Sequence, residues 1–153
     1  MEYSGPSCRP WKCFSVVLFL TLILPGIVHG ASNCRISTRN ITLSFGTLDP
    51  FNPVNVTANG TATLVCVGSE PFAFFMITDD DGLYETGPDQ NRMQNSALLG
   101  EYIPYSFSIS PASGRVPKGV DLPFSITATV LGMDYQDAAA GMYADIVTVT
   151  ITP

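Results

Sequence analysis

Apolar and polar side chains alternate strictly at the C-terminal end of the chain. Over residues 143–152, one set of alternate positions holds Tyr143, Asp145, Val147, Val149 and Ile151, and the other holds mainly threonine. A two-residue period places successive side chains on opposite faces of a β-strand. The pattern therefore predicts one terminal strand with a buried face, and the sequence ends one residue after it.

Shorter alternating segments fill most of the chain before this strand. Turn residues separate them, residues 111–119 are expected to form a loop, and no segment keeps a helical period over a useful length. Residues 134–141 predict one helical turn at most. The predicted strands cover residues 36–45, 61–67, 72–78, 102–110 and 122–131, with a weaker candidate at 91–99.

The number and spacing of these strands indicate the fold class. Six or seven short antiparallel strands in about 120 residues are typical of a β-sandwich, and no repeat or linker divides the chain. We therefore expect an all-β protein with a single immunoglobulin-like sandwich. Asp79-Asp80-Asp81-Gly82 predicts a hairpin turn, because Asp and Gly tolerate positive φ. A weak cation site is the alternative there, although the glutamate of a calcium loop is absent.

The N-terminal segment has the pattern of a secretory signal peptide. Basic residues precede an apolar core at residues 13–28, and small residues follow it. Cleavage after Gly30 would give a signal peptide, 1–30, and one domain, 31–153. A membrane anchor is the alternative, but Pro25-Gly26 interrupts the core, which is shorter than the roughly 20 residues of a spanning helix.

The cysteines divide at the same boundary. Cys8 and Cys13 fall in the predicted signal peptide, whereas Cys34 and Cys66 stay in the domain. An even pair in an exported chain predicts one disulfide. A metal site would need further ligands, but residues 31–153 contain no other cysteine and no histidine, so we expect no metal and no cofactor.

The composition also argues against several classes of function. Without histidine in the domain, Ser-His and Cys-His nucleophile pairs cannot form, so we expect no enzyme and assign no catalytic residue. The chain has 7 basic and 13 acidic side chains, a formal net charge of −6, and no basic cluster, which disfavours nucleic acid as a partner. Asp145 and Arg92 are interpreted as structural residues, Asp145 through a hydrogen bond to backbone.

The run Phe72-Ala73-Phe74-Phe75-Met76 supports two interpretations. Neighbouring residues of a strand point to opposite faces, so Phe74 and Phe75 cannot both enter the core. The first interpretation is a core strand with one face half covered. The second is an exposed apolar end that contacts a surface or a partner.

Several short motifs occur in a specific order along the predicted domain. They are Cys34, Ser44-Phe45-Gly46, Asp49-Pro50, Gly60-Thr61-Ala62-Thr63, Cys66, Asn91-Arg92-Met93, the stretch with Leu99, Tyr102 and Tyr105, and the terminal segment 141–151. Their order and spacing resemble the spore coat protein U domain family, which includes the Csu-type pilins of archaic chaperone–usher pili, over nearly all of residues 31–153. The family's aromatic–Gly–Arg element is incomplete here, because residues 130–134 contain no arginine.

The resemblance implies a sandwich that lacks its final strand, which a chaperone and then a neighbouring subunit supply by β-strand addition. On this hypothesis Val147, Val149 and Ile151 form the acceptor edge, because an open apolar edge invites pairing. The implied function is a non-catalytic, secreted structural or adhesive subunit of a chaperone–usher pilus, serving surface attachment or biofilm. The implied partners are a periplasmic pilus chaperone, an outer-membrane usher and other pilus subunits.

The position of this subunit in a pilus depends on its N-terminus. Cleavage after Gly30 would leave Ala31-Ser32-Asn33 before the first cysteine, about 10 Å of extended chain, whereas a strand-long groove needs about 17–20 Å. We therefore expect a subunit that accepts a strand without donating one, at a tip, after export to the periplasm and the cell surface. Two other hypotheses stay open, namely a self-contained secreted spore or cell coat protein and an extracellular ligand-binding module.

Overall fold

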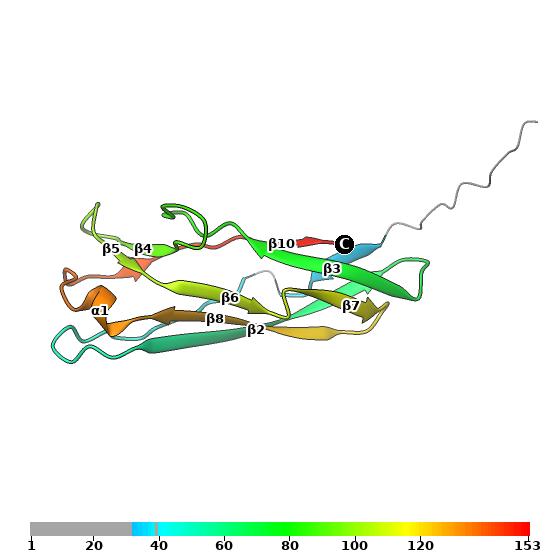
Figure 1. Ribbon diagram of the computed structural model, residues 1–153, viewed down its shortest axis with the longest axis horizontal. Helices are drawn as coiled ribbons and strands as arrows, with labels where there is room; N and C mark the ends of the chain where they lie inside the picture. Colours follow the sequence, from blue (N-terminus) through cyan, green and yellow to red (C-terminus); the bar gives the residue numbers. More distant parts are fainter. Residues whose placement is uncertain (1–31, 39) are drawn as a thin grey trace, which may run out of the picture.

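The computed structural model describes residues 32–38 and 40–153, and the signal peptide prediction therefore lies outside the described residues (Figure 1). No helix among these residues has the length and apolar character needed to span a membrane. The elements are β1 (Asn33–Ile36), β2 (Val56–Val67), β3 (Phe72–Asp79), β4 (Arg92–Asn95), β5 (Tyr102–Pro104), β6 (Ser106–Ser110), β7 (Ser113–Pro117), β8 (Leu122–Val130), α1 (Gly132–Tyr135), β9 (Tyr143–Ala144) and β10 (Val149–Thr152).

The largest sheet has the strand order β1-β2-β8-β6, and all its pairs are antiparallel. The β2–β8 ladder is its longest part, running from Val56 opposite Val130 to Leu64 opposite Leu122. The predicted alternation of β2 is confirmed, because Ala62, Leu64 and Cys66 are buried while the residues between them are more exposed. This sheet forms one layer of the sandwich.

Two three-stranded sheets, β10-β3-β7 and β5-β4-β9, complete the fold. In Figure 1 the strands β3 and β10 lie above β2 and β8, and α1 lies at the far end of the molecule from the C-terminus. Two clusters of buried side chains fill the interior, one around Leu64, Phe75 and Phe124, the other around Ile103 and Val130. The structure is an immunoglobulin-like β-sandwich, as the strand pattern predicted.

Two of the predicted strands differ from the structure. The strand predicted at 36–45 does not form, because β1 ends at Ile36 and residues 40–48 have no strand partner among the described residues, although their side chains alternate in burial. The single strand predicted at 143–152 is divided into β9 and β10, because its first part pairs with β4 and its last part with β3. The residues between these two pairings, 145–148, belong to no sheet.

Three further predictions need correction. Residues 102–110 form two strands in different sheets, because the chain changes partner at Tyr105, whose N–H donates to Asn91 O at 3.0 Å. Residues 113–117 form β7 and not a loop; Val116 is its only buried side chain, so no two-residue period was visible. Asp81 and Gly82 have positive φ, 59° and 90°, yet no hairpin follows, since β3 pairs with β7 and β10.

Candidate functional site

An apolar groove of about 1400 Å³ lies between two segments that belong to no sheet over much of their length. Residues 40–48 border one side, and residues 138–149 border the other. Strands of the largest sheet and of the β5-β4-β9 sheet contribute most of the remaining lining, including the buried Ile103, Ile126 and Ala128. At one end of the groove β10 approaches β1 (Figure 1).

The first edge, residues 40–48, has the side chains of a strand but not its main-chain pairing. Ile41, Leu43 and Phe45 are half-buried against the core, and the residues between them are exposed. Residues 40–48 make no backbone–backbone hydrogen bond to any other described residue. Gly60 of β2 provides the space for this packing, because a Cβ there would lie 2.8 Å from Ile41 Cγ2 and from Leu43 Cδ2.

Both ends of this first edge are anchored. On its N-terminal side, the Ser37 N–H donates to Thr63 O at 2.9 Å, next to the last pair of the β1–β2 ladder. On its C-terminal side, the buried Tyr135 hydroxyl donates to Val54 O at 2.8 Å and accepts the Val54 N–H at 2.9 Å. The edge is thus fixed at its ends and held between them by side-chain packing alone.

The second edge, residues 145–149, is held in part by carboxylates. Asp145 Oδ1 accepts the Leu83 N–H at 3.0 Å, and Asp145 Oδ2 accepts the Tyr105 hydroxyl at 2.6 Å. The prediction that Asp145 makes a structural hydrogen bond to backbone is therefore confirmed. Burial, together with this hydrogen bond to Asp145, raises the pKa of Tyr105 far above its ordinary value, so the hydroxyl stays a donor.

The three predicted acceptor residues lie on the same side of the terminal segment and are all half-buried. Val147 and Val149 line the groove. Ile151 lies outside the groove lining, in β10 opposite Ile77 of β3. Their role as an acceptor edge stays a prediction, and for Ile151 it requires the groove to extend along β10.

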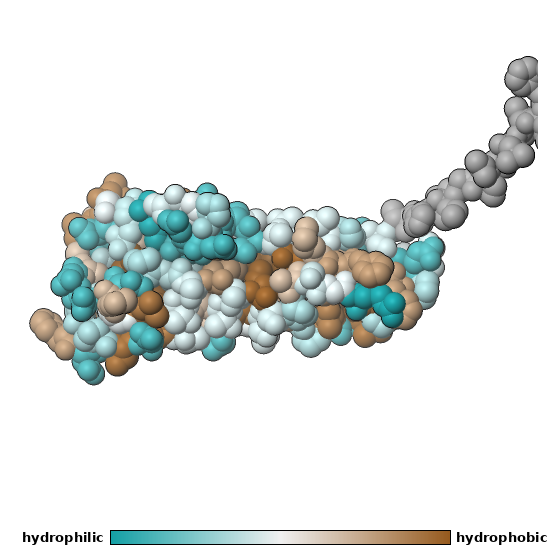
Figure 2. Space-filling model, in the orientation of Figure 1, coloured by the Kyte–Doolittle hydropathy of each residue, from teal (hydrophilic) through white to brown (hydrophobic). Residues whose placement is uncertain are grey.

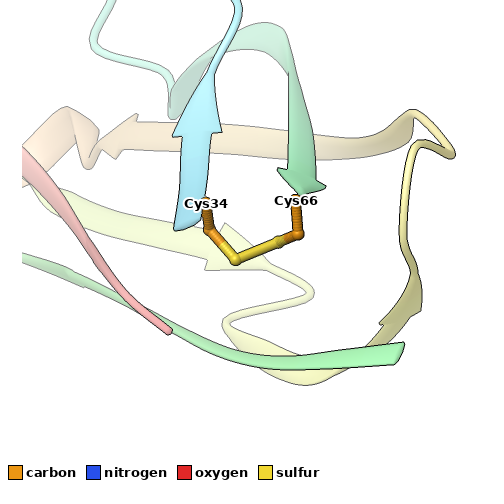
Figure 3. Close-up of a disulfide and its surroundings, with 2 residues drawn as sticks. All are labelled: Cys34 and Cys66. Carbon is orange, nitrogen blue, oxygen red and sulfur yellow. A yellow bond between two sulfur atoms is a disulfide. The ribbon is translucent and has the colours of Figure 1, made fainter. Parts of the chain in front are cut away.

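The predicted disulfide is present. Cys34 of β1 is bonded to Cys66 of β2, and the two residues face each other in the ladder (Figure 3). Cys66 is fully buried in the first core cluster. The bond therefore ties β1, which leads into the first edge of the groove, to the largest sheet.

Two further residues singled out in the sequence have structural surroundings. The Arg92 guanidinium lies 4.1 Å from the centroid of the Tyr102 ring and donates to Tyr84 O. Asp80 Oδ1 accepts N–H groups from Gly82 and Thr148, at 3.1 and 2.8 Å. In the part of the chain that the structure describes, no group of three or more His, Cys, Asp or Glu side chains could hold a metal ion.

The aromatic run forms β3, a core strand with one exposed face, and its contact with a surface or a partner stays a prediction. Phe75 and Ile77 are buried, whereas Phe72, Phe74 and Met76 point outward, and Phe74 is 71% exposed. The Arg115 guanidinium lies 4.1 Å from the centroid of the Phe72 ring. Figure 2 shows hydrophobic and hydrophilic surface side by side at this end of the sandwich. The strand thus has a core face and an exposed apolar face.

Sequence reasoning missed the first edge of the groove, residues 40–48. It assigned the acceptor role to the terminal strand alone, although Ile41, Leu43 and Phe45 alternate in the same way as Val147 and Val149. It also did not connect Gly60 or Asp80 with the groove. A glycine inside a strand that otherwise alternates well is a signal of close approach by another segment, and it could have indicated the first edge.

The fold and the groove define a β-sandwich protein of the immunoglobulin-like class with an open apolar groove between its layers. The chain matches the family model of the Spore Coat Protein U domain over residues 26–150 and belongs to that family. The match begins within the segment predicted as signal peptide, so cleavage after Gly30 stays a prediction.

Two further comparisons were made. No curated protein matches the chain. One similar solved structure is described as "Chaperone-tip adhesin complex is vital for synergistic activation of CFA/I fimbriae biogenesis", with 13% sequence identity and a TM-score of 0.48. The likeness covers 79% of this chain and 41% of the other, so the chain spans less than half of that structure's length.

Proposed function

We propose that this protein is a non-catalytic subunit of a chaperone–usher pilus, and that it accepts a β-strand from a partner in the groove between residues 40–48 and 145–149. One observation carries the proposal. Both edges present alternating apolar side chains to a groove of about 1400 Å³, and each leaves main-chain groups without a strand partner among the described residues. A strand laid between them would complete the sandwich.

The physical chemistry of strand addition supports this use of the groove. An inserted strand gains main-chain hydrogen bonds along its edges, and its alternate side chains fill apolar pockets. Unpaired strand edges with apolar side chains otherwise favour aggregation. The Spore Coat Protein U domain family also fits, because the resemblance to Csu-type pilins implies the same mode of assembly.

The proposal includes the partners and the location. A periplasmic pilus chaperone would fill the groove first, an outer-membrane usher would receive the complex, and a neighbouring subunit would then replace the chaperone. The protein would be exported across the inner membrane and act at the cell surface, in attachment or biofilm. The tip position depends on cleavage after Gly30 and is tested by sequencing the N-terminus of the exported protein.

The proposal is tested by expressing the full chain with and without a periplasmic pilus chaperone from the same organism. We expect a stable soluble complex with the chaperone, whereas the free chain, although soluble at first, is degraded or aggregates with time. A stable, cooperative monomer that ignores the chaperone would contradict the proposal and favour a self-contained coat protein. A monomer that binds small molecules in the groove would favour an extracellular ligand-binding module.

Imaging separates the tip position from a shaft position. The chain is expressed with chaperone and usher, and the product is viewed by electron microscopy. A tip subunit is expected to give no long fibres by itself, because it has no strand to donate. Long homopolymeric fibres whose N-terminus is Ala31 would contradict the tip assignment while leaving the strand-acceptor proposal intact.

A further inference from the structure

In residues 145–149, the main-chain groups of alternate residues face two different sides, one toward the turn after β3 and the other away from β3. Successive residues of an extended chain direct their N–H and C=O groups to opposite sides. Thr148 directs its groups toward the turn after β3, because its C=O accepts the Asp80 N–H at 3.2 Å and its N–H donates to Asp80 Oδ1 at 2.8 Å. By the same alternation, the main-chain groups of Val147 and Val149 face away from β3.

On the side that faces away from β3, no strand of the described residues is hydrogen-bonded to this segment. Val147 makes no backbone–backbone hydrogen bond to another described residue, and β10, which contains Val149, is the edge strand of its sheet. Both residues line the groove. Their N–H and C=O groups are therefore available to a strand that enters it.

On the opposite side, Asp80 takes the place of a further strand residue. Its Oδ1 atom accepts both the Thr148 N–H at 2.8 Å and the Gly82 N–H at 3.1 Å. Although desolvation by burial raises the pKa of Asp80, the hydrogen bonds from Thr148 and Gly82 outweigh it and lower that pKa below its ordinary value. The carboxylate is therefore charged at neutral pH, which strengthens both hydrogen bonds.

Asp145 binds the segment on the side that faces β3, as Asp80 does, but at Ile146, two residues before Thr148. Its Oδ1 atom accepts the Ile146 N–H at 2.8 Å and the Leu83 N–H at 3.0 Å, which joins the segment to the turn after β3. Its Oδ2 atom accepts the Tyr105 hydroxyl at 2.6 Å, which joins it to the junction of β5 and β6. The carboxylate is thus oriented from two directions.

We infer that Asp80 and Asp145 are positioning residues of the acceptor edge: they bind the N–H groups of Ile146 and Thr148, so that the main-chain groups of Val147 and Val149 face the groove. This inference rests on the proposed function. It assigns to two carboxylates the task that a neighbouring strand performs elsewhere in a sheet. The edge is held in an extended form before any partner strand arrives.

The test measures how much of the soluble exported chain is bound by a tagged periplasmic pilus chaperone. Asp80→Ala and Asp145→Ala each remove two hydrogen bonds from N–H groups to a charged acceptor. We expect the bound-to-free ratio to fall at least about tenfold, because losing one such hydrogen bond is worth about that factor. Asp121→Ala is the matched control, since Asp121 is exposed and lies outside the groove lining.

Additional variants separate positioning from general destabilisation. Leu64→Ala weakens the core away from the groove lining, so it should reduce the amount of soluble chain but not the bound-to-free ratio. Asp80→Asn should restore most binding, because an amide oxygen still accepts N–H groups. If Asp145→Ala does not accumulate, Tyr105→Phe removes only the hydroxyl that orients Asp145, and we expect a decrease of about threefold to tenfold.

The outcomes separate this inference from the proposed function. Equal binding of wild type, Asp80→Ala and Asp145→Ala would overturn the inference and leave the proposed function intact. A decrease that Leu64→Ala reproduces in full would also overturn it, because the effect would then be general instability. If the wild-type chain is never bound, the proposed function fails and the inference fails with it.

Discussion

The β2–β8 ladder and the two edges of the groove share the same alternation of side chains, but their main chains differ. In the ladder, each residue from Val56 to Leu64 faces a partner on β8. Residues 40–48 alternate just as clearly and make no backbone–backbone hydrogen bond to another described residue. Alternation therefore reports which side chains are buried, and it does not report whether a neighbouring strand is present.

The largest effect is expected in the ladder. Leu64 is fully buried, so Leu64→Ala should lower the free energy of unfolding by about 4–5 kcal/mol, the upper range for a core leucine. Leu43→Ala, on the half-buried first edge, is the matched variant and should cost less than half as much. Denaturant unfolding of both variants in the same partner state measures the difference, and equal losses would mean that the edge belongs to the core sheet.

A slightly smaller loss of stability is expected when the Cys34–Cys66 disulfide, which links the ladder to the first edge, is removed. Cys34→Ser opens a loop closed by residues 32 positions apart, which should cost about 3–4 kcal/mol in the chain-entropy model. We expect the variant to accumulate poorly after export. Mass spectrometry with and without reduction checks the wild type, where alkylation of two thiols in unreduced folded protein would contradict the bond.

The next prediction concerns binding more than stability. Val149→Asp places a charge in the apolar groove and should lower capture by the chaperone at least about tenfold, because a buried unpaired charge is strongly disfavoured. Thr150→Asp is the control, since Thr150 is exposed and its side chain points away from the groove. Co-purification with the chaperone is the measurement, and equal effects would mean that the register is misassigned.

The smallest effect on stability is expected at Gly60, where the first edge packs against β2 of the ladder. Gly60→Ala would bring a methyl group to 2.8 Å from the Ile41 and Leu43 side chains, so the edge must shift. We expect a cost of about 1–3 kcal/mol, typical of overpacking, with the ladder itself intact. Cleavage of residues 40–48 by a nonspecific protease should accelerate while amide hydrogen exchange in β8 stays unchanged, whereas faster exchange in β8 as well would show that the edge and the ladder are one unit.

The fold could be predicted from the sequence where burial alone decides the structure. The buried side chains of β2, β3 and β8 were predicted correctly, because a two-residue period distinguishes core positions from surface positions. Partner choice could not be predicted in this way. The break between β9 and β10 depends on Asp80 and Asp145, which hold residues 145–148 through side chains, and β7 depends on pairing with β3 around a single buried residue, Val116.

Only one of the two edges of the candidate site could be predicted from the sequence, because alternation reports burial and not strand pairing. Val147 and Val149 were found because the terminal pattern is long and regular. The first edge was read as an ordinary strand, since a sequence pattern carries no information on missing main-chain partners. Only the three-dimensional structure reveals that residues 40–48 and 145–149 face the same groove.

The pairing of β2 with β8 also determines when the domain can fold. Val56 meets Val130, and Leu64 meets Leu122, so the central ladder joins residues that are far apart in the chain. Such long-range pairing is slow to form because a large loop must close first. In a chain that crosses a membrane from its N-terminus, β2 would emerge well before β8 and would wait with its apolar row exposed. During that interval the protein is most open to proteases and to aggregation, before the groove has formed at all.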